Sequence, residues 1–377
     1  MRKIYFIFLI LIVLSFIFGF SLSYLIFNKP IIPIATNKFE LLNEVSDLIV
    51  KNYVDEKNEI DLCKGLVSSL NDPYSNFFTP EEYSKFKEDI SGEYVGIGVL
   101  IGMRDNKIKI LQVFKNSPAF EAGLPVGSYI IEVDGVKTEN LSLDEVANMV
   151  RGKEGTFVNI KVEKNSEILS FKIQRRKIVA ETVSYKIIEN NIGYLKILTF
   201  TDSTPNEVVD ALTEFNKENI KGLILDLRDN PGGLLSSLKK VADYLLPEGT
   251  LFYIEKKGEK IEVKTYGKGL NFPLVVLVNE NSASASEILA GAIKDRNLGT
   301  LIGTKTYGKG LIQTIYNLKG GYGLELTTER YLTPSLYALN GKGIEPDIVI
   351  EFEENKEDPF MDSQMVKAIE YLKKLIK

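Results

Sequence analysis

A strand, a helix and a second strand follow one another closely in the C-terminal half of the chain, and this unit constrains the fold most. The apolar, β-branched run 272–279 predicts a short buried strand. Apolar residues then recur at helical spacing, so a helix is expected to begin near Ser284. A second strand is expected over 299–303, followed by a turn bracketed by Gly308 and Gly310. One serine therefore sits where a strand becomes a helix.

The same alternation occurs upstream of this unit. Strands are expected over 192–200 and 222–227, and helices over 204–216 and 235–246. Residues 204–207 (Thr-Pro-Asn-Glu) predict a capping box with proline at the first helical position. Repeated strand–helix–strand units favour an α/β fold, in which helices cover the faces of a mostly parallel sheet.

The chain contains no histidine, and this limits the chemistry available to the serine. Ser-His-Asp and Cys-His nucleophiles are excluded, and so is any metal site with a histidine ligand. If Ser284 is a nucleophile, its base must be a lysine or a carboxylate. Lys309, in the glycine-bracketed turn, can serve only if burial keeps its amine neutral, because desolvation disfavours the ammonium form.

Plainer interpretations exist for each motif. Ser284 and Glu287 fit a capping box that only satisfies the end of a helix, and Lys309 alone is typical of a solvated loop charge. Residues 303–309 also form most of a phosphate-binding loop. That loop is excluded, because Gly310 stands where serine or threonine must hold magnesium and because a strand, not a helix, is expected next.

Two segments together resemble a known family. Residues 281–287 (Asn-Ser-Ala-Ser-Ala-Ser-Glu) and 306–310 (Thr-Tyr-Gly-Lys-Gly), with Gln313, look like the C-terminal processing (tail-specific) serine peptidases. The resemblance implies that Ser284 is the nucleophile, that Lys309 is the general base and that Gln313 orients the lysine. It also implies a crotonase-like α/β core and a reaction that needs no cofactor and no metal.

The segment 226–233 leaves the C-terminal end of a strand, where open α/β sheets keep their ligand sites. Its two glycines would let backbone amides approach a substrate oxygen, although a plain turn has the same composition. The resemblance implies an oxyanion hole formed by the amides of Gly233 (or Gly232) and Ala285. Asp295 matches an aspartate that the family keeps near the site, and a structural role is expected for it.

A second resemblance lies in the N-terminal half. Residues 117–124 and 127–135 resemble a PDZ domain. In such domains, the amides of a glycine loop hold the terminal carboxylate of a peptide while the peptide adds a strand to the sheet. Gly96, Ile97 and Gly98 would form that loop, although an ordinary turn fits these three residues alone. A dinucleotide-binding loop is not expected, because the third glycine of its motif is missing.

The N-terminus is expected to cross a membrane. Arg2 and Lys3 precede an apolar run over 4–27, which exceeds the roughly 20 residues that a membrane-spanning helix needs. No convincing small-residue cleavage site follows, so a cleaved signal peptide is the less favoured alternative. The two basic residues favour a cytoplasmic N-terminus. The body of the protein should then lie outside the cytoplasm.

Five regions are therefore expected. They are a membrane anchor over 1–29, a helical N-terminal region over 37–90, an inserted PDZ domain over 91–176, a mixed-sheet peptidase core over 177–355 and a C-terminal helix over 356–377. The basic residues 175–177 (Arg-Arg-Lys) are expected to form the linker into the core.

The remaining composition restricts the partners. The net charge is −5 with both signs mixed, and no basic block suggests nucleic acid. Cys63 cannot form an internal disulfide and has no metal-ligand companions. The expected partners are polypeptides with free C-termini and the membrane, and the sequence leaves homo-oligomerisation open. The main alternative is a catalytically silent PDZ scaffold that binds C-termini.

One residue departs from the family pattern. Lys305 stands where an uncharged residue is common in the motif before the lysine turn. A second ammonium group near Lys309 would lower the pKa of Lys309 further if both side chains face inward. The sequence fits equally well with a Lys305 side chain that points to solvent.

Overall fold

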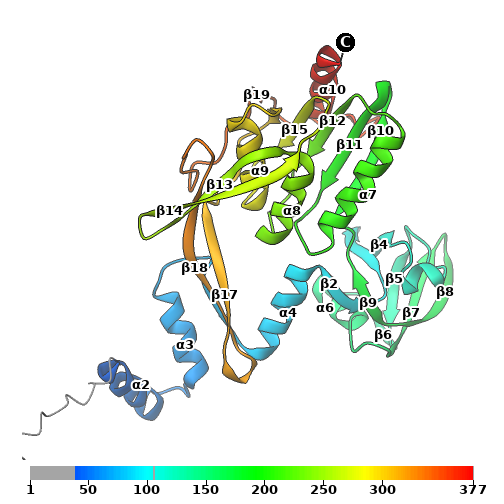
Figure 1. Ribbon diagram of the computed structural model, residues 1–377. Helices are drawn as coiled ribbons and strands as arrows, with labels where there is room; N and C mark the ends of the chain where they lie inside the picture. Colours follow the sequence, from blue (N-terminus) through cyan, green and yellow to red (C-terminus); the bar gives the residue numbers. More distant parts are fainter. Residues whose placement is uncertain (1–38, 105–106, 377) are drawn as a thin grey trace, which may run out of the picture. The chain divides into compact units, whose positions relative to one another are not determined.

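The computed structural model describes residues 39–104 and 107–376 (Figure 1). The membrane anchor expected over 1–29 lies outside these residues. Within them, no helix combines the length and the apolar character that crossing a lipid bilayer requires. The chain divides into two compact units, residues 1–69 and 70–377, and each is described by itself.

The first unit contains two helices, which lie within the helical N-terminal region expected over 37–90. Helix α2 spans Glu40–Asn52 and helix α3 spans Glu59–Ser68. A capping box between Asn58 and Asp61 closes the first turn of α3. Cys63 is a free, partly buried thiol within α3.

The second unit opens with a turn at residues 71–75, followed by strand β1 (Asn76–Phe78) and helix α4 (Pro80–Ser91). Strand β1 was not expected, because three residues are too few to show an alternating pattern. It forms by pairing with a distant strand, β18 (Gly323–Leu332). The region expected to be helical therefore contributes a strand to one of the peptidase sheets.

The PDZ region forms one sheet in the order β3-β4-β5-β7-β8, with the short strand β6 on β5. Helices α5 and α6 pack against it around a contiguous apolar core, as the expected mixture of short strands and helices requires. The bounds are β3 Val99–Arg104, β4 Lys107–Val113, α5 Pro118–Glu121, β5 Tyr129–Val133, β6 Val136–Lys137, α6 Leu143–Val150, β7 Phe157–Lys164 and β8 Glu167–Gln174.

The basic residues 175–177, which were expected to mark the linker into the core, lie at the end of the PDZ sheet. They lead into strand β9 (Arg176–Val179), which pairs with β2 (Glu93–Gly96). The Arg175 side chain is buried and donates to the carbonyl oxygen of Val150 at the end of α6 (2.9 Å). The chain thus enters and leaves the PDZ domain through a paired ribbon, and one of the three charges serves as an internal hydrogen-bond donor.

The peptidase core contains a six-stranded sheet in the order β10-β11-β12-β15-β16-β19. Only β10 and β11 run antiparallel, which confirms the mostly parallel sheet. Successive residues of a strand point to opposite faces of its sheet. On one face of β12, Leu223 and Leu225 belong to a buried apolar cluster that includes residues of α7, α8 and α9. On the other face, Ile224 belongs to a second cluster that includes residues of α10. Helices therefore cover both faces (Figure 1).

The bounds of this layered core are β10 Val183–Ile188, η1 Glu189–Asn191, β11 Ile192–Ile197, α7 Thr204–Lys217, β12 Gly222–Asp226, α8 Leu235–Leu245, β15 Leu274–Val278, α9 Ala285–Asp295, β16 Thr300–Gly303, β19 Ile348–Val349 and α10 Ser363–Leu375.

The capping box expected over 204–207 is wrong. Helix α7 begins at Thr204 and has no side-chain cap hydrogen bond from Ser203. The Glu207 carboxylate instead accepts the backbone amide of Thr182, just before β10 (2.8 Å). The Glu207 carboxylate therefore bonds a distant segment of the chain, and not the start of its own helix as the local sequence pattern predicted.

A second sheet joins β1, β18, β13 and β14 in that order, with β17 on the other edge of β18. Strands β17 and β18 were expected, whereas the long β13–β14 hairpin was not. The bounds are β13 Pro247–Lys256, β14 Glu259–Lys268, β17 Leu311–Asn317 and the turn η2 Lys319–Gly321 between β17 and β18.

A buried ion cluster holds the C-terminal helix against the loop that follows β12. Arg228 contacts Asp226 (2.7 Å) and Asp362 (2.9 Å), and it donates to Gln364 (3.0 Å). Removing one member of such a buried cluster leaves an uncompensated charge. The cluster therefore fixes the loop at the end of the strand, where the predicted site lies.

Candidate active site

Ser284 lies at a strained turn between a buried strand and a helix. All of β15 is buried, and α9 begins at Ala285, which confirms the expected start of the helix. Ser284 itself has φ 55° and ψ −115°, a combination that residues with side chains rarely adopt. A sharp turn of this kind raises a serine hydroxyl above the end of an α/β sheet, where it is exposed to a substrate.

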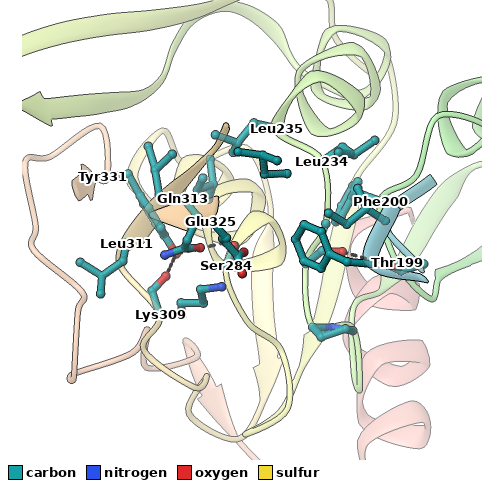
Figure 2. A pocket seen from close by; sticks show the side chains of 18 residues that line it. Thr199, Phe200, Leu234, Leu235, Ser284, Lys309, Leu311, Gln313, Glu325 and Tyr331 are labelled. Atoms are coloured by element: carbon teal, nitrogen blue, oxygen red, sulfur yellow. Dashed lines mark hydrogen bonds between the residues drawn. The ribbon is translucent and has the colours of Figure 1, made fainter. Parts of the chain in front are cut away.

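Ser284 faces a cavity of about 410 Å³. Lys309, Gln313 and Glu325 line the same cavity, and Figure 2 shows Lys309 extending toward Ser284. The structure therefore brings the three predicted catalytic side chains together. The rest of the wall is mostly apolar and includes Phe86, Ile90, Phe200, Leu234, Leu235, Ile288, Leu311, Ile312, Ile315 and Tyr331.

A buried carboxylate connects the serine turn to the lysine turn. Glu287 is fully buried, and one of its oxygens accepts the amides of Ser284 (3.0 Å) and Lys309 (2.9 Å). The other oxygen accepts the Gly308 amide (2.7 Å) and the Thr306 hydroxyl (2.6 Å). The capping interpretation accounts for only one of these four bonds. Together they prevent the two turns from moving independently.

Tyr331 forms a second connection between the same turns. Its hydroxyl donates to the carbonyl oxygens of Ser284 (3.1 Å) and Lys309. Burial raises the pKa of the Tyr331 phenol well above its usual range, so the group remains a hydrogen-bond donor at any physiological pH. The backbone on both sides of the reacting groups is therefore fixed by buried hydrogen bonds.

The Lys309 amine is partly withdrawn from water, as the predicted base requires. Burial lowers the pKa of Lys309 below its usual range, while its neighbours Glu325, Tyr307 and Asp72 act in the opposite direction. Burial also raises the pKa of Glu325. The lysine and this glutamate therefore face each other across a region where both are easier to neutralise than in water.

The lysine amine rests on an aromatic ring in this structure. Its Nζ atom lies 4.5 Å from the centre of the Tyr74 ring, a distance at which an ammonium group is attracted to the ring face. Within residues 39–104 and 107–376, no hydrogen bond joins this amine to the Ser284 hydroxyl. The Tyr74 ring is therefore a direct neighbour of the Lys309 amine.

Gln313 lies in the cavity beside Lys309, but its side-chain amide donates to the Thr327 hydroxyl (3.1 Å). The orientation of Lys309 by Gln313, which the family resemblance implies, stays a prediction. The bond to Thr327 uses the side-chain N–H of Gln313 and not its carbonyl oxygen.

Two residues discussed from the sequence point away from the cavity. Lys305 forms an ion pair with Glu345 (2.9 Å), and this hydrogen-bonded contact raises the pKa of Lys305. It is exposed and adds no charge beside Lys309. Asp295 accepts the Thr333 hydroxyl, so it braces a turn, as expected.

Backbone amides next to Ser284 are available to a ligand. The Gly232 amide donates to Asn230 (2.9 Å), whereas those of Gly233 and Ala285 have no hydrogen-bond partner in the part of the chain that the structure describes. A Cβ added at Gly232 would lie 2.7 Å from the Ser284 Cβ, so only glycine fits there. Of the two candidate glycines, Gly233 is the one whose amide remains free.

The glycine loop of the PDZ domain has the features that carboxylate binding needs. Ile97 is buried in the domain core, and Gly98 has φ 81°. A Cβ added at Gly98 would lie 2.2 Å from the Ser117 Cβ. Among the described residues, no partner is found for the amides of Ile97 and Gly98. Gly96 closes strand β2 at the entrance to the loop.

The arrangement can support acyl transfer. It combines a serine hydroxyl, a partly desolvated amine and free backbone amides around one cavity. No cluster of cysteine, aspartate and glutamate side chains suited to a metal ion is found in residues 39–104 and 107–376. Sequence reasoning did not find Glu325 or Tyr331, which line the cavity, or Tyr74, which contacts the Lys309 amine, because these residues come from elements far away in the chain.

These features define a class: a serine protease with an α/β core and a PDZ domain. The family model of peptidase family S41 matches residues 191–350, and the PDZ domain model matches residues 109–164. A "Probable CtpA-like serine protease" of Staphylococcus aureus (strain MRSA252) is 36% identical over 341 residues, which is 87% of this chain and 68% of that protein. One of Staphylococcus haemolyticus (strain JCSC1435) is 39% identical over 291 residues, covering 76% and 58%.

A solved structure gives the same result. The photosystem II D1 C-terminal processing protease superposes with a TM-score of 0.52 and 28% identity, over 82% of this chain and 86% of that one. The chain belongs to peptidase family S41 and is a serine protease of the CtpA-like kind. It spans about two thirds of the length of the Staphylococcus aureus relative.

Replacing Glu287 by glutamine tests the connection between the two turns. The side-chain NH₂ of glutamine would be directed at one or more of the four donors that now bond the Glu287 carboxylate, and two donors cannot bond each other. The free energy of unfolding should therefore fall by roughly 2 to 4 kcal/mol. Activity of the folded variant should fall by roughly a hundredfold, because small displacements of reacting groups have such effects. Urea unfolding and peptide hydrolysis measure the two. Glu280→Gln is the control, since Glu280 bonds Thr304 at the surface; equal losses in both variants would contradict the assignment.

Replacing Glu325 by glutamine tests the electrostatics of the base. The Glu325 carboxylate raises the pKa of Lys309, so its removal should lower that pKa and move the rising limb of the pH–rate profile to lower pH. Tyr307 and Asp72 also face the amine and remain unchanged in this variant. The control is Glu329→Gln on the same strand, whose carboxylate pairs with Lys256. An unmoved limb in Glu325→Gln would show that the two groups are not coupled.

Proposed function

We propose that this protein is a membrane-tethered, extracytoplasmic endopeptidase that recognises polypeptide C-termini through its PDZ domain and hydrolyses peptide bonds with a Ser284–Lys309 dyad. The observation that carries the proposal is the shared cavity of a strained serine and a partly desolvated lysine in a chain without histidine.

The first step is removal of the serine proton. Neutral Lys309 leaves the Tyr74 ring, which attracts only the ammonium form, and accepts the proton of the Ser284 hydroxyl. The serine oxygen then attacks the carbonyl carbon of the substrate. In this position the side-chain carbonyl oxygen of Gln313 orients the amine, while its N–H group keeps the bond to Thr327.

The second step is stabilisation and collapse of the tetrahedral intermediate. The free amides of Gly233 and Ala285 donate to the oxyanion, a contribution that is often the largest in acyl transfer. The protonated Lys309 gives its proton to the leaving amine, and the peptide bond breaks. Water then hydrolyses the acyl-serine with Lys309 again as the base, so no cofactor takes part.

Substrate selection is assigned to the PDZ domain. The unpartnered amides of Ile97 and Gly98, beside Gly96, would receive a terminal carboxylate, and the peptide would add to the sheet of the domain. The apolar run over 4–27 would tether the protein to the membrane, with Arg2 and Lys3 on the cytoplasmic side. The substrates are then proteins or peptides outside the cytoplasm.

A catalytically silent scaffold remains the alternative. It would bind C-termini without hydrolysis, and its cavity would have no reason to desolvate a lysine beside a strained serine. The complete set of Ser284, Lys309 and two free amides favours the enzyme.

The dyad predicts the effect of two substitutions. Ser284→Ala and Lys309→Ala should each lower kcat by roughly 10³-fold or more, and the double variant should lose little more, because the two residues act as a unit. Lys305→Ala is the matched control, since Lys305 carries the same charge on the same turn but pairs with Glu345. Substantial hydrolysis by Lys309→Ala would remove the dyad from the proposal.

Recognition of C-termini predicts a difference between two forms of one peptide. A substrate with a free C-terminal carboxylate should be cleaved faster at sub-saturating concentration than the same peptide with a C-terminal amide. Bulky residues at Gly98 are a poor test, because they clash with Ser117 and would disturb the domain itself. Equal rates for the two peptides would leave a general endopeptidase whose PDZ domain has another role.

A further inference from the structure

A turn at residues 72–75 lies beside the predicted catalytic side chains, although it belongs to a distant part of the chain. The Nζ atom of Lys309 is 4.5 Å from the centre of the Tyr74 ring. Strand β1, which follows the turn, pairs with β18, and Gln313 of β17 stands opposite Thr327 of the same β18. The turn therefore lies against the lysine and alongside the strand that faces the glutamine.

Asp72 is the acceptor that shapes this turn. Its carboxylate accepts the Tyr74 amide (3.1 Å) and the Ser75 hydroxyl (2.6 Å), an arrangement in which an aspartate side chain mimics a backbone turn. The oxygen of the buried Ser75 accepts the Thr327 amide (3.0 Å), and a further hydrogen bond joins the Asp72 carboxylate to the Thr327 side chain. Asp72 is therefore fixed against β18 at Thr327.

The Thr327 hydroxyl takes a defined direction between Asp72 and Gln313. An ionised carboxylate can only accept hydrogen bonds, so the hydroxyl directs its proton to Asp72 and presents a lone pair on its other side. The Gln313 side chain donates an N–H to that oxygen (3.1 Å), which turns the Gln313 carbonyl oxygen away from Thr327. In the part of the chain that the structure describes, no hydrogen-bond partner is found for this carbonyl oxygen.

The direction of the Gln313 amide matters to the lysine in the same cavity. A carbonyl oxygen can accept an N–H of the Lys309 amine in both protonation states, and it leaves the lone pair of the neutral amine for the serine proton. A Gln313 turned the other way would present N–H groups to the ammonium form, which has donors only. The two ends of a glutamine amide are nearly equal in shape, so its surroundings select the direction.

We propose that Asp72 is a positioning residue that, through the Thr327 hydroxyl, fixes the direction of the Gln313 amide. In that direction the carbonyl oxygen is free to accept from the Lys309 amine. We refer to the three hydrogen-bonded side chains of Asp72, Thr327 and Gln313 as the Asp72 network. This inference rests on the proposed peptidase function and adds what orients the glutamine that orients the base.

Two substitutions at Thr327 separate this network from the charge of Asp72. Thr327→Val keeps the shape of the side chain but removes the hydroxyl, whereas Thr327→Ser keeps the hydroxyl. The valine variant should have a lower Lys309 pKa, because the ammonium form loses an acceptor. Its plateau kcat should fall by roughly tenfold, the effect of one lost hydrogen bond to a charged group. The serine variant should keep both values near the wild type. Neither variant changes the titratable groups that face the amine, which are Glu325, Tyr307, Asp72 and Tyr74.

A double-mutant cycle tests whether Asp72 acts through Gln313. Asp72→Asn should lower the plateau kcat by roughly tenfold, because the asparagine N–H can donate to Thr327 and reverse the network. In a Gln313→Ala background the same substitution should change kcat little. Asp358→Asn is the matched control, since the exposed Asp358 also accepts the amide two residues ahead, that of Phe360 (3.1 Å). Losses that simply add in the double variant would overturn the proposal.

The Lys309 titration needs no substrate, so it separates this inference from the function on which it rests. It is followed by NMR of protein labelled with ¹³C at lysine Cε. A lower Lys309 pKa in Thr327→Val than in Thr327→Ser, without hydrolysis by wild-type protein, would keep the Asp72 network and overturn the peptidase. Hydrolysis by wild-type protein, with equal Lys309 pKa and kcat in the two Thr327 variants, would keep the peptidase and overturn the network. If the valine variant fails to fold, the double-mutant cycle decides alone.

Discussion

A single buried carboxylate determines whether this site can exist. Glu287 accepts donors from two turns that lie more than 20 residues apart, and no ion pair to it is found in residues 39–104 and 107–376. It sits in the first turn of α9, where the helix dipole favours a negative charge. The strained backbone of Ser284 persists because this network, with Tyr331, outweighs its cost. Loss of the network would release both the nucleophile and the base.

The chemistry then depends on a balance at Lys309. Burial favours the neutral amine, whereas Glu325, Asp72 and the Tyr74 ring favour the ammonium form. A protease whose base were always neutral would attack any chain that reached it. In the proposed mechanism, a substrate that fills the apolar cavity displaces water from both Lys309 and Glu325, which shifts the balance toward neutral groups. Substrate binding and activation of the base are therefore linked by desolvation.

Much of the architecture could be predicted from the sequence, because apolar periodicity is local. The β15–α9 turn, the mostly parallel sheet and the meeting of Ser284 with Lys309 followed from it and from the family resemblance. The wrong predictions share one physical cause: contacts with residues far away in the chain replace the contacts that local sequence patterns predict. Glu207 bonds the amide of Thr182 instead of the end of its own helix, and β1 forms by pairing with β18. Contacts such as Tyr74 on Lys309 have no local signal.

The pKa of the Lys309 amine tests the account most directly. It can be measured by NMR titration of protein labelled with ¹³C at lysine Cε, with Lys309→Arg protein used to assign the signal. The account predicts a pKa below the usual lysine range in the wild type, and one that falls further in Glu325→Gln. A Lys309 signal that titrates at or above the usual lysine value, unaffected by Glu325, would contradict the lysine base and the mechanism built on it.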